Sequence, residues 1–284
     1  MAADSIRTFK DIDWVTLRNN AMARKGWKRK TASDWDKKAE SFSESRKHHQ
    51  YIHLFLEKLP LDSTSTVLDI GAGPGTLALP VAKRAKEVTA IDFSQSMLDL
   101  LNKQAEEQGL NNIRTVKCAW EDDWQKKQIA PHQIAIASRS MGVQDLPAAL
   151  QKINSFATDY VFLSDRVGPT PFEPAAFDAI GRDFQPGPDY IYTVNTLYTM
   201  GIYPNISMLE LDRDTVCSSM EEAFDSYRWM FHDLTPKESG LLRTYLEKHV
   251  VKANKDQIII RRPHPVRWAL IWWQKDKSPS STMF

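Results

Sequence analysis

The sequence predicts an α/β protein built on a doubly wound, mostly parallel sheet. Strand and helix patterns alternate along the central part of the chain, and the first strand pattern ends in a glycine-rich turn that opens the next helix. Right-handed crossovers between parallel strands place such helices on both faces of a sheet. With 284 residues, of which 42% are hydrophobic, the chain is long enough to bury a core of that size.

The central elements follow one another from residue 66 to residue 165. The β-branched "TVLDI" (66–70) predicts a strand, and the alanine-rich "TLALPVAKRAK" (76–86) predicts a helix. A second strand is expected at "EVTAIDF" (87–93), followed by a helix with a serine cap and a terminal glycine at "SQSMLDLLNKQAEEQG" (94–109). Further strands are expected over 112–120, 132–140 and 159–165, with a helix over 146–157.

The two ends of the chain depart from this alternation. Residues 1–60 show no strand pattern, and the amphipathic "HHQYIHLFLEKL" within them indicates an N-terminal helical cap. Residues 61–284 are expected to form the main domain. Prolines and glycines at about 167–189 indicate a lid loop, and a helix is expected over 189–201. Two late strands, 206–212 and 266–275, flank an expected helical insertion at about 218–252.

Composition excludes several classes of protein. A formal net charge of +1 gives no large field of one sign, so the expected partner is a small molecule, and a nucleic acid is not expected. The two cysteines, Cys118 and Cys217, are too few for a disulfide framework or a thiolate metal site, and no bound metal is expected. The N-terminus lacks the apolar run of a signal peptide, and no stretch reaches the roughly 20 apolar residues that span a bilayer. We therefore expect a cytoplasmic protein with no membrane segment.

The stretch "TVLDIGAGPGTLALPVAKRAKEVTAIDF" (66–93) carries the clearest functional signal. Gly71, Gly73 and Gly75 lie between a strand and a helix, where bare backbone and helical N–H groups can approach a ligand. Dinucleotide-binding proteins hold a pyrophosphate on a similar loop. Here Asp69 would repel that pyrophosphate by about 4 kcal/mol at about 4 Å and an effective dielectric of about 20. A cationic ligand would be attracted instead, which argues against a nicotinamide-dependent oxidoreductase.

Together with Asp92 at the end of the second strand, these residues resemble the class I S-adenosylmethionine-dependent methyltransferases. The resemblance covers the strand and helix order from about residue 61 to 165, and the late strand pair resembles the family's closing hairpin. It implies a seven-stranded Rossmann-like sheet and S-adenosyl-L-methionine as cofactor. It also implies that Gly71 and Gly73 pass beneath the methionine part, that Asp69 helps to hold its ammonium group and that Asp92 binds the ribose. The candidate cofactor-binding residues are Asp69, Gly71, Ala72, Gly73, Gly75, Thr76, Asp92, Phe93, Met97, Trp120, Glu121, Ser138 and Arg139.

The segment after the third strand departs from the family pattern. Many relatives carry an aspartate there that accepts a hydrogen bond from the adenine amino group, whereas "KCAWEDDW" offers Trp120, Glu121 and Asp122. We expect Trp120 or a neighbour to cover the adenine face and an acidic neighbour to lie near the amino edge. A core position for Trp120 is equally compatible with the sequence.

The methyl acceptor leaves a weaker signal. The sulfonium is already activated, so the protein chiefly orients the acceptor and excludes water, and no fixed catalytic motif is needed. Arg139, next to Ser138 and Ser140, could clamp a carboxylate of the methionine tail or of an anionic acceptor, or form a surface ion pair. His232 is a candidate base. Tyr192 is a candidate pocket residue, although its spacing also suits a helix core.

Other patterns have simpler explanations. His49 and His53 have the spacing of metal ligands, but a solvated helix face explains them better, and "RKGWKRK" indicates a solvated basic turn. Trp35 or Phe42 is expected to help cover the cofactor from the cap. The predicted function is a methyltransferase that uses S-adenosylmethionine and a small-molecule acceptor. The alternatives are a nicotinamide-dependent oxidoreductase and a catalytically silent cofactor-binding or scaffold protein.

Overall fold

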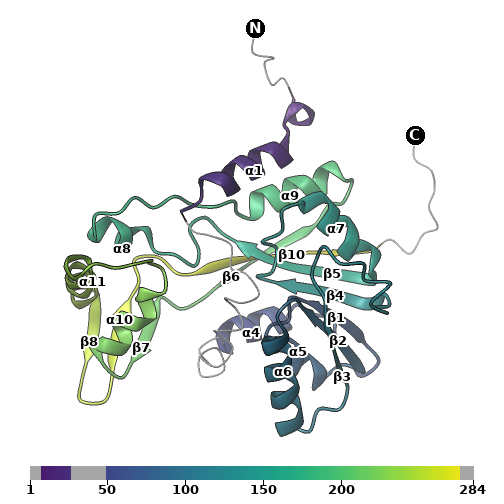
Figure 1. The fold of residues 1–284 in the computed structure, drawn as a ribbon, viewed down its shortest axis with the longest axis horizontal. Coiled ribbons are helices and arrows are strands. Elements are labelled where there is room, and N and C mark those ends of the chain that lie inside the picture. Colours follow the sequence, from purple (N-terminus) through teal and green to yellow (C-terminus); the bar gives the residue numbers. More distant parts are fainter. Residues whose placement is uncertain (1–7, 27–48, 276–284) are drawn as a thin grey trace.

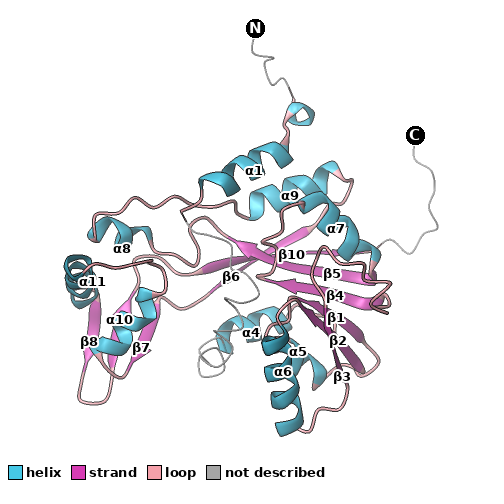
Figure 2. Ribbon diagram, in the orientation of Figure 1, coloured by secondary structure: helices cyan, strands magenta, loops and turns pink. Residues whose placement is uncertain are grey.

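The computed structural model describes residues 8–26 and 49–275 and contains a central seven-stranded sheet (Figures 1 and 2). The strand order is β3-β2-β1-β4-β5-β10-β6, and β1 to β5 run parallel, while β10 is antiparallel to both β5 and β6. This arrangement confirms the predicted doubly wound, mostly parallel sheet with a closing hairpin. The strands are β1 (Thr66–Ile70), β2 (Glu87–Asp92), β3 (Ile113–Lys117), β4 (His132–Ser138), β5 (Ala157–Arg166), β6 (Asn205–Glu210) and β10 (Arg267–Gln274).

Helices cover both faces of this sheet (Figure 2). On one face, α4 (His49–Leu56), α5 (Ala78–Ala82) and α6 (Gln95–Glu107) pack on strand side chains such as Val67 and Ile136. On the other face, α7 (Leu146–Ser155) and α9 (Tyr190–Thr199) pack on Leu68 and Ala135. Because successive side chains of a strand point to opposite faces, Val67 and Leu68 contribute to different cores. Both faces are therefore apolar, as expected for central parallel strands.

The segment between β6 and β10 folds into a small α/β unit, here called the insertion. It contains a three-stranded antiparallel sheet in the order β7-β9-β8, formed by β7 (Asp214–Cys217), β8 (Val250–Ala253) and β9 (Ile258–Arg261). The expected helices are present as α10 (Met220–Arg228) and α11 (Pro236–Lys248), each capped at its N-terminus by a serine or threonine side chain. The three strands were not expected, so the insertion is of mixed α/β structure.

The expected lid loop is interrupted by a short helix, α8 (Pro174–Ala179). Its Ala176 and the following Ile180 are buried in the apolar core of the insertion, together with Phe224 and Leu242. The chain after β5 thus crosses to the insertion, contributes to its core and returns to α9 (Figure 1).

The N-terminal segment contributes the 3-10 helix η1 (Phe9–Asp11) and the helix α1 (Trp14–Arg24), which lies along α9 (Figure 1). Arg18 of α1 is buried and donates hydrogen bonds to the carbonyl oxygens of Met141, Val143 and Gln144 in the loop after β4. Trp35 and Phe42 lie outside the described residues. Of the helices within residues 8–26 and 49–275, none is long and apolar enough to cross a membrane.

Candidate functional site

The loop between β1 and α5 places bare backbone at the carboxyl edge of the sheet. Gly75 has a φ of +89°, and a Cβ there would lie 2.3 Å from Leu101 Cδ1, so packing against α6 requires glycine. Gly73 also has a positive φ, of +55°, but a Cβ at this position would meet no atom within 4 Å. The loop is therefore packed tightly at Gly75 and opens toward free space at Gly73.

Asp92, the last residue of β2, holds this loop in place. Its Oδ2 accepts a hydrogen bond of 2.9 Å from the backbone N–H of Gly73, and its Oδ1 accepts one of 2.9 Å from the N–H of Ser94. The N–H groups of Gly71 and Ala72 both donate to the carbonyl oxygen of Ile91, which fixes the base of the loop to β2. A carboxylate oxygen can accept a second hydrogen bond, so Asp92 keeps acceptor capacity for a ligand.

Asp69 presents a buried carboxylate beside this loop. Its side chain is only 2% exposed, and no group of the described part of the chain forms a hydrogen bond to Oδ2. Burial, followed by the charge of Asp92, raises the pKa of Asp69 to about 7, although the N–H of Ala78 opposes the rise. A buried acceptor without a partner is costly, and a cationic ligand group would offset that cost.

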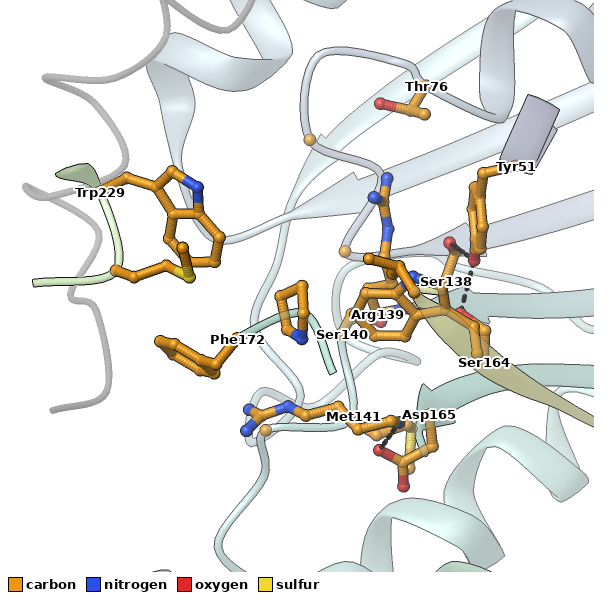
Figure 3. A pocket seen from close by; sticks show the side chains of 18 of the residues that line it. Tyr51, Thr76, Ser138, Arg139, Ser140, Met141, Ser164, Asp165, Phe172 and Trp229 are labelled. Carbon is orange, nitrogen blue, oxygen red and sulfur yellow. Dashed lines mark hydrogen bonds between the residues drawn. The ribbon is translucent and has the colours of Figure 1, made fainter. Parts of the chain in front are cut away.

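A large cavity of about 2310 Å³ lies along the carboxyl edge of the sheet, between the loops after the strands and the insertion (Figure 3). Ligand sites of open α/β sheets occupy this edge. The cavity brings together most of the residues that the sequence predicted for the site. Those that line it are Asp69, Gly71, Ala72, Gly73, Thr76, Asp92, Phe93, Met97, Trp120, Glu121, Ser138, Arg139 and His232.

Two candidates lie elsewhere. Gly75 is absent from the lining because it packs beneath the loop on Leu79 and Leu101, so its contribution is to the shape of the loop. Tyr192 packs edge-on against Trp14, with ring centroids 6.5 Å apart, and lines a smaller pocket between α1 and α9. We therefore omit Tyr192 from the candidate acceptor site.

Arg139 follows β4 and is held in an uncommon backbone conformation, with a φ of +55°. Its backbone N–H donates to Ser164 Oγ over 3.0 Å. Its guanidinium carbon lies 4.5 Å from the centre of the Tyr51 ring and 5.8 Å from that of Trp268. No carboxylate of the described residues forms an ion pair with it. Arg139 is thus stacked on aromatic rings at the cavity wall, and no acidic side chain within residues 8–26 and 49–275 pairs with its hydrogen-bond donors.

Tyr51 was not predicted as a site residue. Its hydroxyl forms hydrogen bonds of 2.7 Å with Ser138 Oγ and 2.6 Å with Ser164 Oγ, and burial raises the pKa of its phenol (Figure 3). Tyr51 therefore links α4 to the ends of β4 and β5, and its ring packs against the guanidinium of Arg139. The amphipathic pattern of α4 predicted only that one face would be buried.

Trp120 lies between the core and the cavity, a position compatible with both of the roles that the sequence left open. Its Nε1 donates to the carbonyl oxygen of Ser140 over 3.1 Å, and its ring packs on buried Trp124 with centroids 5.5 Å apart. It is half-buried and lines the cavity, as does the exposed Glu121 beside it. The indole is therefore fixed at the edge of the core, with part of its surface toward the cavity.

Comparisons with known proteins agree with this geometry. A family model described as a methyltransferase domain matches residues 67–159. An uncharacterized protein of Haemophilus influenzae is 32% identical over 246 residues, which covers 86% of this chain and 89% of that protein. A probable ribosomal RNA small subunit methyltransferase A of Methanosphaera stadtmanae is 41% identical over 66 residues, or 23% of this chain and 24% of that protein.

A solved structure shows the same fold. The crystal structure of the YcgJ protein from Bacillus subtilis superposes with a TM-score of 0.53 at 15% identity, covering 81% of this chain and all of that one. The glycine loop, the two acidic strand residues and the sheet order thus occur together with a methyltransferase-domain match. The chain belongs to the class I S-adenosylmethionine-dependent methyltransferases.

Proposed function

We propose that this methyltransferase acts on a small-molecule acceptor, which binds in the cavity between the sheet edge and the insertion. The observation that carries the proposal is the cavity itself, which is lined on one side by the candidate cofactor residues and on the other by the insertion. Pockets for single small ligands usually measure about 300–1,000 Å³, so a cavity of 2310 Å³ has room for a cofactor and an acceptor together. A formal net charge of +1 gives no large field of one sign, which favours a small molecule over a nucleic acid.

The residues that would hold the cofactor follow from their positions. Asp69 Oδ2 would accept a hydrogen bond from the ammonium group, and Asp92 would use its remaining acceptor capacity for the ribose hydroxyls. The open face of Gly73 lets the cofactor approach the backbone, and Met97 and Trp120 would contact the adenine. S-adenosylmethionine supplies an activated methyl group, so the protein needs chiefly to orient the acceptor and exclude water.

Arg139 is the residue that we assign to an anion. Its guanidinium is stacked on Tyr51 at the cavity wall, and a guanidinium can hold a carboxylate through two parallel hydrogen bonds. The carboxylate belongs either to the methionine tail or to the acceptor, since Arg139 lies between the glycine loop and the insertion side of the cavity (Figure 3). His232, at the insertion side, remains a candidate base for acceptors that must lose a proton.

Replacement of Asp92 tests the cofactor site. We expect Asp92→Ala to weaken S-adenosylmethionine binding by about 1.5–3 kcal/mol, measured by titration calorimetry, because a charged acceptor is lost. Asp99→Ala is the matched control, since Asp99 is exposed on α6, does not line the cavity and accepts a hydrogen bond from the exposed Gln95. Equal affinity of a folded Asp92→Ala variant would remove Asp92 from the site.

The acceptor class is tested by incubating the protein and a labelled cofactor with metabolite extracts and, separately, with total RNA. Label transferred to a small metabolite supports the proposal, and label transferred to RNA alone overturns it. Cofactor binding without transfer to either pool would favour the catalytically silent binding protein.

A further inference from the structure

The segment after β5 and the insertion each present one aromatic side chain to the cavity, Phe172 and Trp229, which together are here called the aromatic wall (Figure 3). Their ring centroids are 5.4 Å apart and their planes are inclined by 40°. Trp229 is 46% exposed although it follows a helix with a well-buried apolar face, and the neighbouring Met230 and Phe231 are buried. An exposed indole on the wall of a deep cavity leaves a large apolar surface available to a ligand.

A buried polar network fixes the aromatic wall. Glu173, next to Phe172, accepts hydrogen bonds from the hydroxyls of Tyr227 and Tyr245 and pairs with Arg262, whose Nε lies 2.6 Å from Glu173 Oε2. Arg262 also donates to the carbonyl oxygen of Pro171 over 3.0 Å. The network thus connects the segment that carries Phe172 to the helix that ends just before Trp229. Rings held in this way lose little conformational freedom when a ligand binds.

The aromatic wall is separate from the candidate cofactor residues. Those residues lie at the ends of β1, β2 and β4 or in the segments that follow β1 to β4, whereas the aromatic wall is formed by the segment after β5 and the insertion and faces Arg139 and Ser140 across the cavity (Figure 3). Two ion pairs of the insertion lie near this wall, Arg228 with Asp225 and Arg243 with Glu221, and Asp233 is a further charged residue that lines the cavity. The ligand surface offered by Trp229 is therefore mainly apolar and flat.

We propose that the acceptor contains a planar aromatic ring system, which lies against Trp229 and Phe172 while the reacting atom is directed toward the glycine loop. This inference rests on the proposed function and specifies the class of acceptor. Flat rings gain offset or edge contacts with indole and phenyl faces that saturated apolar molecules of the same size do not gain. An acceptor of this kind spans the distance from the insertion to the cofactor side and uses the volume that the cofactor leaves free.

The test uses N-phenyl-1-naphthylamine, an uncharged aromatic probe whose fluorescence rises in apolar sites, with the protein saturated with S-adenosylhomocysteine. We expect Trp229→Ala to lower the affinity for this probe about tenfold and Trp229→Phe to restore most of it. Tyr203→Ala is the control, because Tyr203 is 71% exposed and does not line the cavity. Displacement of the probe by 2-naphthol should be about tenfold more effective than displacement by decahydro-2-naphthol, its saturated counterpart.

Each outcome has a distinct meaning. If wild type and Trp229→Ala bind S-adenosylhomocysteine and the probe equally well, the aromatic wall is not the probe site and the inference fails. If both naphthols displace the probe equally, the site recognises apolar volume and not planar rings, and the inference also fails. If wild type does not bind S-adenosylhomocysteine by calorimetry, the proposed function fails, whatever the probe does. Thermal unfolding of each variant shows whether it is folded.

Discussion

The glycine loop and the insertion border one cavity, but the contacts that stabilise each region differ greatly in sequence separation. In the loop, Asp92 binds the N–H groups of Gly73 and Ser94, which are 19 and 2 positions away in the sequence. The insertion is held instead by Glu173 of the segment after β5, which binds Tyr227, Tyr245 and Arg262, 54, 72 and 89 positions away. The contacts that hold the glycine loop therefore lie within one short segment, whereas those that hold the insertion join segments that meet only in the folded protein.

The two regions therefore differ in how many parts of the chain must be compatible for each region to form. A local strand, loop and helix can form the same cofactor site in many proteins, since few other parts of the chain must agree with it. The insertion depends on several distant residues that must be present together. Mutations on the two sides should therefore have different consequences for stability and for specificity.

The largest effect is expected at Glu173. Glu173→Ala would leave the half-buried Arg262 without its carboxylate partner and two buried tyrosine hydroxyls without an acceptor, which we expect to cost about 3–5 kcal/mol in free energy of unfolding. Urea denaturation measures the total loss in free energy of unfolding. Hydrogen exchange locates the loss, which should affect residues 214–262 strongly while β1 keeps its protection.

Glu221→Ala is the matched control within the same insertion. Glu221 pairs with Arg243 at 2.7 Å, but both side chains are substantially exposed, and exposed pairs contribute only about 0–1 kcal/mol. A Glu173→Ala variant no less stable than Glu221→Ala would show that the long-range network does not hold the insertion together.

An intermediate effect is expected at Arg139, where the two sides meet. Lysine cannot reproduce the two parallel hydrogen bonds of a guanidinium, so Arg139→Lys should lower kcat/KM for the identified acceptor about tenfold or more, near 1.4 kcal/mol. Loss of cofactor affinity as well would assign the carboxylate to the methionine tail, and intact affinity would assign it to the acceptor. A variant equal to wild type in both measurements would show that Arg139 recognises neither anion.

The range of the contacts also explains what could be predicted from the sequence. The β-branched runs of β1 and β2, the serine cap of α6 and the glycine loop are local patterns, and they were predicted correctly. The strands β8 and β9 were missed because they have only four residues each. The sequence did contain a signal for a β-hairpin, because the β-branched "VV" and "III" flank a turn. In this turn Asn254 Oδ1 accepts hydrogen bonds from the N–H groups of Asp256 and Gln257.

The candidate site residues also divide into those with a local sequence pattern and those whose position depends on distant contacts. Asp69 and Asp92, which line the cavity, were proposed from the sequence because of their positions near the glycines. Tyr51 and Trp229 also line the cavity but were not proposed, because each looks like an ordinary residue of an amphipathic helical segment and only the tertiary structure shows what it faces. Tyr192 is the opposite case. Its sequence pattern suggested a pocket residue, whereas its ring packs against Trp14 of α1.

The smallest effect on binding is expected from the titration of Asp69 between pH 6 and pH 7, and it tests the proposed cofactor site alone. Burial and the charge of Asp92 raise the pKa of Asp69 to about 7 from an ordinary value near 3.9. The folded, cofactor-free protein therefore holds this proton more tightly than the unfolded chain. The stability that Asp69 contributes is fully present below about pH 4 and is lost as the pH rises through about 7.

Cofactor binding should show the opposite trend, because an ammonium group prefers the ionised carboxylate. If only the ionised form binds, affinity for S-adenosylmethionine should rise about fivefold between pH 6 and pH 7 and level off above pH 8. Calorimetry in two buffers of different ionisation enthalpy should detect about half a proton released per cofactor bound at pH 7. Asp69→Asn should bind more weakly and lack this part of the pH dependence. An unchanged pH profile in Asp69→Asn would show that another group, such as the neighbouring Asp92, receives the ammonium, and the cofactor side would then be built on one carboxylate and not on two.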